Sequence, residues 1–204
     1  MTCDSMINKK CQLFPLFAAL LALTGCVNLK PSLSQMRSFT LGPVAVDVVE
    51  AEAGVERALY IQRPQLPTFL DGSRLSYRTA SGELKYLPSA RWAEPLNEGV
   101  ARAVALYLGR SGLGEAPAFY PWPNTKAEAA VLTLAFERFS ANESGTVQIV
   151  VNWQVSGAGW APQQTRFISE SIDWEIDRPE TLVAAFNQAL AELAGEIADA
   201  LSKK

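Results

Sequence analysis

The chain has 204 residues, a formal net charge of −3 and 49% hydrophobic residues, which suits one domain with a sizeable core. This mild acidity and the absence of a basic stripe argue against nucleic acid as a partner, because a phosphate backbone is bound through clustered lysine and arginine. The chain has no histidine. Ser-His-Asp and Cys-His catalysis and the common zinc sites are therefore excluded, whereas catalysis by carboxylate, lysine or tyrosine side chains stays open.

The N-terminal residues have the pattern of a bacterial lipoprotein signal. A basic pair, Lys9-Lys10, precedes an apolar run over 13–23. This run is too short to span a bilayer, which takes about 20 apolar residues. Leu23-Thr24-Gly25-Cys26 follows, so that two small residues stand before a thiol. We expect cleavage before Cys26 and covalent attachment of diacylglycerol and an N-acyl chain; an ordinary signal peptide with a chance cysteine is the alternative.

The signal also predicts an address and a domain organisation. We expect a signal peptide over 1–25, a lipidated N-terminus and tether over 26–37, and a single domain over 38–204. Val27 stands where lipoproteins retained in the inner membrane usually carry aspartate, which favours the outer membrane, facing the periplasm. Removal of 1–25 takes away two lysines and one aspartate, so the net charge changes from −3 to −4. It also removes the other two cysteines, so no disulfide can form within one mature chain.

The first half of the domain contains short strand patterns and one hairpin signal. Strands are expected at 38–41, 44–49, 57–61, 74–79 and 83–87. The connection Ser81-Gly82 lies between two alternating runs, which predicts a β-hairpin with Tyr77 and Tyr86 on its buried face.

A helix and an edge strand are expected next. From about Trp92 to Arg110 apolar residues recur at three- and four-residue steps, and Pro95 lies near the start, where a missing amide donor does least harm. The cluster Phe119-Tyr120-Pro121-Trp122-Pro123 allows only a short edge strand, because proline cannot donate to a ladder.

Three long strands and a final helix make up the second half. Strands are expected at 130–139, 147–155 and 166–176, joined as an antiparallel meander. The third strand is expected to place four apolar side chains together: Ile168, Ile172, Trp174 and Ile176. Asp177, Pro179 and Glu180 resemble an N-cap, a first-turn proline and a capping-box acid. One apolar stripe follows: Leu182, Val183, Phe186, Leu190, Leu193, Ile197 and Leu201.

Several short motifs carry a family resemblance. They are Leu59-Tyr60-Ile61, Leu70-Asp71, Leu75-Ser76-Tyr77-Arg78, Leu84-Lys85-Tyr86 and, above all, Arg91-Trp92-Ala93-Glu94-Pro95-Leu96. With them, the chain resembles the ABC-type transport auxiliary lipoproteins, the PqiC/YmbA-like family. The resemblance covers most of 38–201, by identity over 59–108 and mainly by spacing beyond.

The resemblance implies a fold and a role. The implied fold is an α+β domain with a mixed, largely antiparallel sheet and two long helices packed on one face, similar to the N-terminal domain of TolB. The implied role is a non-catalytic auxiliary component of an envelope system that moves phospholipids or other hydrophobic molecules. From this resemblance, together with the absence of histidine, we expect no catalytic residue, no metal and no cofactor. Its partners would be an MCE-domain membrane protein and an ABC transporter or permease. A homo-oligomer is compatible with this role, because MCE proteins form rings, although no residue here indicates one.

Two groups of residues are candidate sites. Arg91 and Glu94 at a helix start can act as an acid/base pair, but an ion pair at an element boundary is the commoner reading, with Trp92 as a core anchor and Pro95 as a helix-start residue. Aromatic residues are enriched at interface hot spots, and an edge strand can accept a partner strand. The candidate partner contacts are Phe119, Tyr120, Trp122 and Trp160; covering the end of the sheet is the alternative.

Two other functions are weighed against the transport role. A lipid-binding carrier would need a pocket of about 300–1,000 Å³ lined by aliphatic side chains. The two predicted helices are expected to cover the apolar face of the sheet, which disfavours such a cavity. An envelope hydrolase could use Glu137 with Asp173 or Glu175, yet nothing in their spacing requires these carboxylates to meet.

Overall fold

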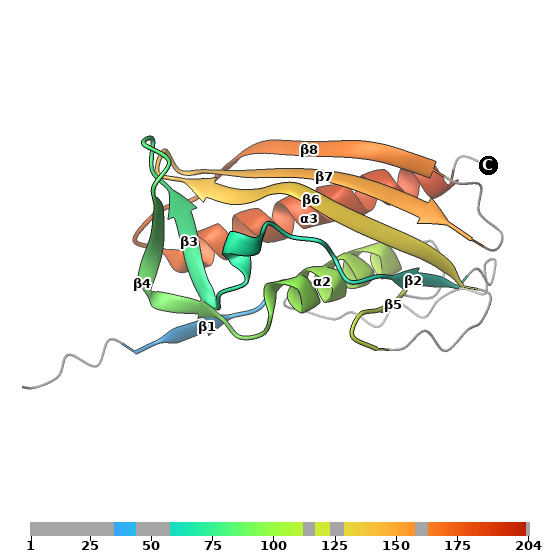
Figure 1. Cartoon of the computed structure of the whole chain (residues 1–204), viewed down its shortest axis with the longest axis horizontal. Helices are drawn as coiled ribbons and strands as arrows, with labels where there is room; N and C mark the ends of the chain where they lie inside the picture. Colours follow the sequence, from blue (N-terminus) through green and yellow to red (C-terminus); the bar gives the residue numbers. More distant parts are fainter. Residues whose placement is uncertain (1–34, 44–57, 112–116, 123–128, 158–162, 203–204) are drawn as a thin grey trace, which may run out of the picture. The chain divides into compact units, whose positions relative to one another are not determined.

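Three long strands form one side of the sheet, and the last of them lies at its edge. The computed structural model describes residues 35–43, 58–111, 117–122, 129–157 and 163–202 (Figure 1). Strands β6 (Ala130–Asn142), β7 (Thr146–Ser156) and β8 (Gln163–Asp173) pair antiparallel in sequence order, so the predicted meander is confirmed. The inward side chains of β7 alternate as expected and are all buried: Val147, Ile149, Val151, Trp153 and Val155.

Shorter strands extend this sheet from β6. The predicted hairpin is confirmed as β3 (Arg74–Arg78) and β4 (Leu84–Trp92), which pair antiparallel. β1 (Arg37–Phe39) lies parallel to β4, and β3 joins β6 in parallel. Along the other half of β6, β2 (Leu59–Ile61) pairs in parallel, and β5 (Ala118–Phe119) is a short edge strand beside β2. The segment between β2 and β3 contains a single 3-10 turn, η1 (Thr68–Leu70).

Two helices complete the fold. Helix α2 (Leu96–Arg110) and helix α3 (Pro179–Ser202) pack against each other, and α3 runs beside β7 and β8 (Figure 1). The whole predicted stripe of α3 is buried: Leu182, Val183, Phe186, Leu190, Leu193, Ile197 and Leu201. In the described residues one mixed eight-stranded sheet thus carries two long helices, and the expected α+β class is confirmed.

An aromatic cluster ties the sheet to α3. The ring of Phe139 stacks on that of Phe186, with 4.2 Å between ring centroids and 3° between ring planes. Trp92, at the end of β4, lies 6.2 Å from Phe186 between ring centroids. Aromatic contacts of this kind add about 0.5–1.5 kcal/mol to the effect of burial. The meander, the end of the hairpin and α3 therefore share one core.

The predicted start of the first helix is wrong. Trp92 belongs to β4, where its backbone N–H donates to the carbonyl of Ser73 at 2.6 Å. The next N–H, that of Ala93, donates to the carbonyl of Phe39 in β1 at 2.8 Å, so the backbone at residue 93 still forms a hydrogen bond with the sheet. The helix begins at Leu96, after Pro95 at its N-cap. The helical spacing of apolar residues includes Trp92 only because the side chain of Trp92 is buried in the same core as the apolar side chains of the helix.

Three side chains predicted to be buried are exposed, two of them because of strand register. Tyr86 is 46% exposed because it lies opposite Ser76, whereas Tyr77 lies opposite Lys85, so the two tyrosines occupy different faces. On β8 the inward residues are Phe167 and Ser169. Over residues 167–169 the strand therefore has the opposite alternation from the predicted one, and Ile168, which pairs with Val150, is 53% exposed. Beyond β8, Trp174 is buried as expected, but Ile176 is 38% exposed.

The start of α3 differs from the predicted capping box. Pro179 is the first helical residue, as its fixed φ favours, so Asp177 lies one residue too early to be the N-cap. Glu180 forms an ion pair with Arg37 of β1, 2.9 Å between Oε2 and Nη1. A hydrogen bond from its own backbone N–H, helped by Arg37 and Arg178, lowers the pKa of Glu180.

Several predictions concern residues outside the described ranges. These are the signal peptide, Cys26, the tether up to residue 34, the strand at 44–49 and the aromatic side chain of Trp160.

Candidate functional site

The Arg91–Pro95 motif lies where β4 passes into α2. The guanidinium Nε of Arg91 donates to the hydroxyl of Ser38 on the neighbouring strand β1, at 3.1 Å. Glu94 forms an ion pair with Arg102, one and a half turns into α2. A Cβ at position 99 would lie 3.2 Å from Oε1 of Glu94, so glycine there leaves room for the carboxylate.

These contacts hold elements together rather than assemble reactive groups. The side chains of Glu94 and Arg102 are each 29% exposed, so the pair is only partly screened and contributes about 1 kcal/mol. Arg91 points to a hydroxyl on β1, whereas Glu94 points along α2 to Arg102. The motif therefore brings no acid/base pair together, and its geometry fits the structural interpretation.

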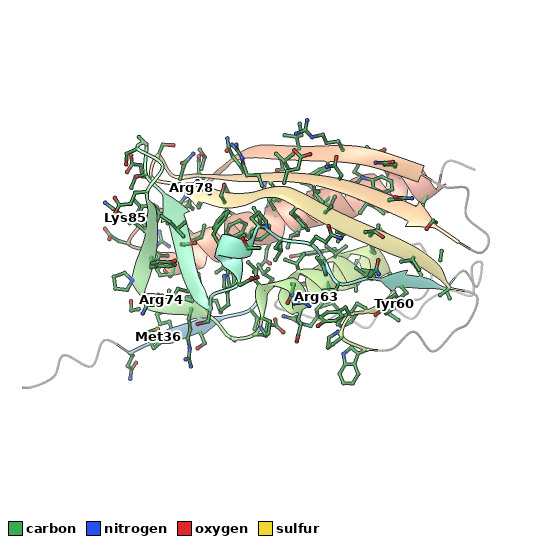
Figure 2. The ribbon with its side chains drawn as sticks, viewed as in Figure 1. Met36, Tyr60, Arg63, Arg74, Arg78 and Lys85 are labelled. Carbon is green, nitrogen blue, oxygen red and sulfur yellow. The ribbon has the colours of Figure 1, made fainter. Side chains whose placement is uncertain are left out.

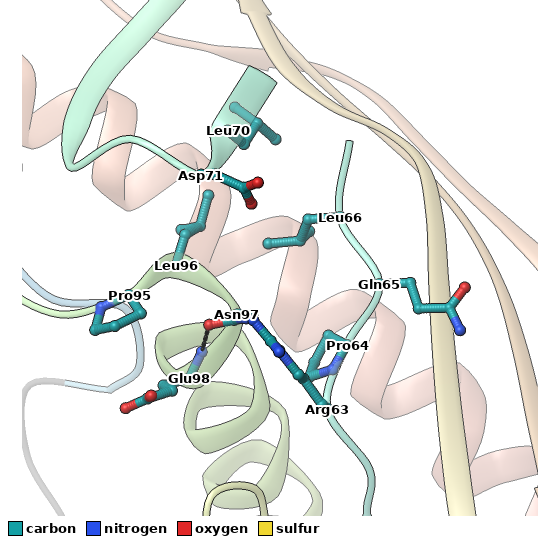
Figure 3. A pocket seen from close by; sticks show the side chains of 10 residues that line it. All are labelled: Arg63, Pro64, Gln65, Leu66, Leu70, Asp71, Pro95, Leu96, Asn97 and Glu98. Carbon is teal, nitrogen blue, oxygen red and sulfur yellow. Dashed lines mark hydrogen bonds between the residues drawn. The ribbon is translucent and has the colours of Figure 1, made fainter. Parts of the chain in front are cut away.

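A surface cleft of about 530 Å³ opens beside the start of α2. Figure 3 shows Leu66, Leu70 and Leu96 pointing into the space between the 63–71 segment and the helix. Charged and amide side chains complete its lining: Arg63, Gln65, Asp71, Asn97 and Glu98. The amide oxygen of Asn97 accepts the N–H of Glu98 at 2.9 Å.

A second cleft, of about 440 Å³, lies against the family motif. Its lining includes Ser38, Ser73, Arg91 and Glu94, and it shares Asp71 and Pro95 with the first cleft. Both clefts are open to the surface and have charged walls. They suit small polar groups or a peptide better than an acyl chain, which requires an enclosed apolar pocket.

The aromatic edge at β5 divides into inner and outer parts. Phe119 is partly buried against the core. Tyr120 donates its backbone N–H to Ile61 of β2 at 2.9 Å, and its ring lies 5.4 Å from the guanidinium carbon of Arg63. Trp122 is 65% exposed. Of the predicted partner contacts within the described residues, Trp122 is thus the one whose ring is mostly available.

The carboxylates considered for hydrolysis do not come together. Glu137 accepts hydrogen bonds from Asn152 at 2.7 Å and Arg166 at 2.6 Å, and these bonds lower the pKa of Glu137. Asp173 lies seven residues beyond Arg166 on β8, a separation of about 20 Å at the usual strand rise. Glu175 instead pairs with Arg178 at 3.2 Å. This arrangement leaves Glu137 as a surface ion-pair residue.

Sequence reasoning missed a basic and aromatic surface on the hairpin. Arg74, Ser76 and Arg78 alternate with buried Leu75 and partly buried Tyr77, so they share the face turned away from the helices. The guanidinium carbon of Arg74 lies 5.6 Å from the centre of the Tyr86 ring, and that of Arg78 lies 4.7 Å from the centre of the Phe69 ring. Arg91 pairs with Arg74 across the two strands.

We call this surface the hairpin face and define it by its residues: Met36, Phe69, Arg74, Arg78, Tyr86 and Arg91. No basic stripe is visible along the chain because these residues come from four places in the fold: the residue before β1, then η1, β3 and β4. The alternation Arg-Leu-Ser-Tyr-Arg was the available signal, since it places two arginines on one side of a strand.

The described residues contain no group of three or more acidic or cysteine side chains placed to hold a metal ion. Within the same ranges, no helix has the length and apolar character needed to cross a membrane.

A family model matches residues 39–198, which include β2 to β8 and most of α3. Its description is "ABC-type transport auxiliary lipoprotein component". A search of curated proteins gave no match.

Two crystal structures are similar in fold. One, of an uncharacterized protein, superposes with a TM-score of 0.65 at 19% identity, covering 81% of this chain and 98% of that chain. The other, protein XCC0632 from Xanthomonas campestris, gives a TM-score of 0.57 at 20% identity, covering 79% and 92% of the two chains. At these identities the structures support the fold alone.

Proposed function

Because the chain belongs to the family of ABC-type transport auxiliary lipoproteins, we propose that it is the auxiliary component of an MCE-type envelope transport system. In this proposal the protein is anchored in the outer membrane through acyl chains on Cys26 and faces the periplasm. It contacts an MCE-domain protein and performs no catalysis itself. The system moves phospholipids or other hydrophobic molecules, together with an ABC transporter or permease.

The family match over residues 39–198 carries this proposal. The Leu23–Cys26 motif supports the anchor, because small residues before a cysteine are what lipoprotein processing requires. One acyl chain gives marginal membrane binding, whereas several give a stable anchor at about 0.8 kcal/mol for each buried methylene.

The β5 edge is the proposed contact for the MCE-domain protein. Trp122 is 65% exposed next to an edge strand, and tryptophan is enriched at interface hot spots. An edge strand also offers backbone groups to a partner strand. The alternative function, a lipid-binding carrier, has less support, because both clefts described above are open and have charged walls.

The partner is tested by crosslinking in cells followed by affinity purification. We expect recovery of an MCE-domain protein with the unchanged chain and at least tenfold less with Trp122→Ala. Tyr86→Ala, which removes an exposed aromatic residue from the hairpin face, is the matched control and should leave recovery unchanged. Recovery of cell-wall enzymes alone would contradict the proposal.

The anchor is tested by membrane fractionation. Cys26→Ser should release the protein from the outer-membrane fraction, whereas Cys11→Ser, within the predicted signal, should not. A Cys26→Ser protein that still fractionates with the outer membrane would show that another feature holds it there.

A further inference from the structure

We propose that the hairpin face docks onto anionic phospholipid headgroups of the membrane that holds the Cys26 anchor. This inference rests on the proposed anchor and adds a second, non-covalent contact between domain and membrane. It concerns a surface distinct from the β5 edge assigned to the protein partner.

Rings and a hydroxyl, instead of carboxylates, are the described contacts of the arginines on the hairpin face. Within the described residues, Arg74, Arg78 and Arg91 form no ion pair, and their contacts are with two rings and one hydroxyl. Three exposed arginines elsewhere pair with carboxylates: Arg37 with Glu180, Arg166 with Glu137 and Arg178 with Glu175. Two others in the described ranges do not, since Arg63 contacts the ring of Tyr120 and Arg138 donates to the amide oxygen of Gln148, but these two do not lie side by side with a third arginine on one hairpin. A chain with a net charge of −3 thus keeps three unneutralised guanidiniums on one small surface.

The topology brings these groups to one side of the molecule. Arg74 and Arg78 share a strand face, Tyr86 lies opposite Ser76 between them, and Arg91 lies opposite Arg74. Figure 2 shows Arg74, Arg78 and Met36 at the end of the domain formed by β1, β3 and β4. This face is opposite to the core, because the buried side chain of β3, Leu75, points the other way.

Exposed apolar groups accompany the charges. Met36 is 52% exposed, Tyr86 46% and Phe69 37%. Amphipathic aromatic side chains are enriched at the headgroup level of a bilayer. Anionic lipids attract arginine side chains that lie near the membrane surface. The arginines of this face therefore suit the charged headgroup layer of a membrane, and its exposed apolar side chains suit the hydrocarbon beneath that layer.

The proposed anchor holds this face within reach of a bilayer. Met36 is the tenth residue after Cys26, and ten residues of extended chain span at most about 35 Å. Met36 directly precedes β1, which borders the hairpin through β4. Because the protein is tethered to the membrane, its hairpin face meets lipid headgroups at a high effective concentration. Three positive charges are then enough for docking, although the same charges would give weak binding if the protein were free in solution. This proximity favours lipid over an acidic protein partner as the occupant.

A fluorophore on the lipidated mature protein tests the proposal. Ser76→Cys places a thiol at the centre of the hairpin face, and Cys26 is blocked by lipid, so an environment-sensitive dye attaches at position 76 alone. The protein is reconstituted into vesicles of phosphatidylcholine with 30% phosphatidylglycerol, or of phosphatidylcholine alone. We expect blue-shifted emission and quenching by headgroup-attached quenchers in the anionic vesicles only, with loss of both signals in 0.5 M salt.

Charge variants identify the groups responsible. Arg74→Ala with Arg78→Ala should lower the ratio of docked to undocked protein about 25-fold, roughly fivefold for each arginine. The matched control, Arg166→Ala with Arg178→Ala, changes the net charge equally and should leave the ratio within twofold. A dye at Gly195→Cys on α3, where nothing lies within 4 Å of an added Cβ, should remain in water throughout.

The outcomes separate this inference from the proposed function. If the protein floats with the vesicles but the dye at position 76 stays in water, the docking is wrong and the anchor stands. If the dye leaves water only after an acidic partner protein is added, the occupant is that protein and the lipid assignment is wrong. If Cys26 carries no lipid, the anchor and this inference fail together.

Discussion

The meander β6–β8 with α3 and the hairpin β3–β4 belong to one sheet, but their polar groups are satisfied differently. In the meander region two buried donors reach carboxylates: the indole N–H of Trp153 donates to Glu196 at 3.1 Å, and the hydroxyl of Ser169 donates to Glu192 at 2.8 Å. The buried indole N–H of Trp174, just after β8, is the exception among the described side chains. On the hairpin face the arginines have no carboxylate partner among the described residues, and apolar side chains remain exposed.

This difference indicates a division of roles. The long strands and α3 bury most of the core, so they determine stability. The hairpin adds only four buried hydrophobic side chains among the described residues, Leu75, Leu87, Ala90 and Trp92, and it keeps charge and hydrophobic surface available for contacts. If this is correct, equivalent substitutions in the two regions will have unequal effects on the free energy of unfolding.

The largest contrast is expected for phenylalanine. Phe186→Ala removes a buried ring that stacks on Phe139, and it should cost about 3–5 kcal/mol of unfolding free energy. Phe69→Ala on the hairpin face should cost under about 1 kcal/mol, because the ring is 37% exposed. Urea denaturation of both variants measures this, and equal losses would contradict the division of roles.

The two hairpin turns offer a glycine comparison. Gly82 and Gly145 have the same positive φ of 86°. A side chain in this region costs about 1–2 kcal/mol at either position. At Gly145 an added Cβ would also lie 2.8 Å from the carbonyl oxygen of Trp174, whereas at Gly82 nothing lies within 4 Å.

Gly145→Ala should therefore be about 1–3 kcal/mol more destabilising than Gly82→Ala. Denaturation of both alanine variants under the same conditions gives the difference. A smaller loss at Gly145 would mean that the turn of the meander relaxes more readily than that of the hairpin.

The regular part of the fold follows from the sequence. The meander and α3 have long uninterrupted patterns of apolar residues, with a period of two over Val147–Val155 and a helical period over Leu182–Leu201. Many successive residues therefore support the assignment of each element. The hairpin was found from its turn residues, Ser81-Gly82, together with the alternating runs on both sides.

The errors fall where register matters. Tyr86 and Ile168 were assigned to the wrong face, because a one-residue shift moves a strand's side chains to the other side of the sheet. The irregular pairing between Arg74 and Ser76 changes the alternation along β4 in a way that no local pattern reveals. The hairpin face itself depends on which strands become neighbours, so single segments could not predict it.

Two serines test whether side-chain hydrogen bonds stabilise the meander region more than the hairpin region. Ser169→Ala removes a hydroxyl that is 6% exposed and bonded to Glu192, and it should cost about 1 kcal/mol. Ser38→Ala removes an exposed hydroxyl that accepts from Arg91 and should cost less than about 0.5 kcal/mol. Thermal unfolding of the two variants gives the order; a larger loss for Ser38→Ala would place a stabilising contact on the hairpin side.

The smallest expected effect concerns the titration of Glu137. Hydrogen bonds from Asn152 and Arg166 hold the pKa of Glu137 below its ordinary value. Because the carboxylate form is favoured in the folded state, its stabilisation is complete above the ordinary glutamate range near pH 4.3 and is lost as the pH falls through the lowered pKa. Asn152→Ala and Arg166→Ala should each raise this pKa, as followed by NMR of the side-chain carboxyl carbon.

Arg74→Ala provides the matched control for this titration. It removes an arginine that contacts a ring instead of a carboxylate, so the pKa of Glu137 should not move. A shift of this pKa in Arg74→Ala would mean that the positive charge of the hairpin face acts on the carboxylates of the meander. That charge would then be partly neutralised within the protein, and less of it would be available to an anionic surface.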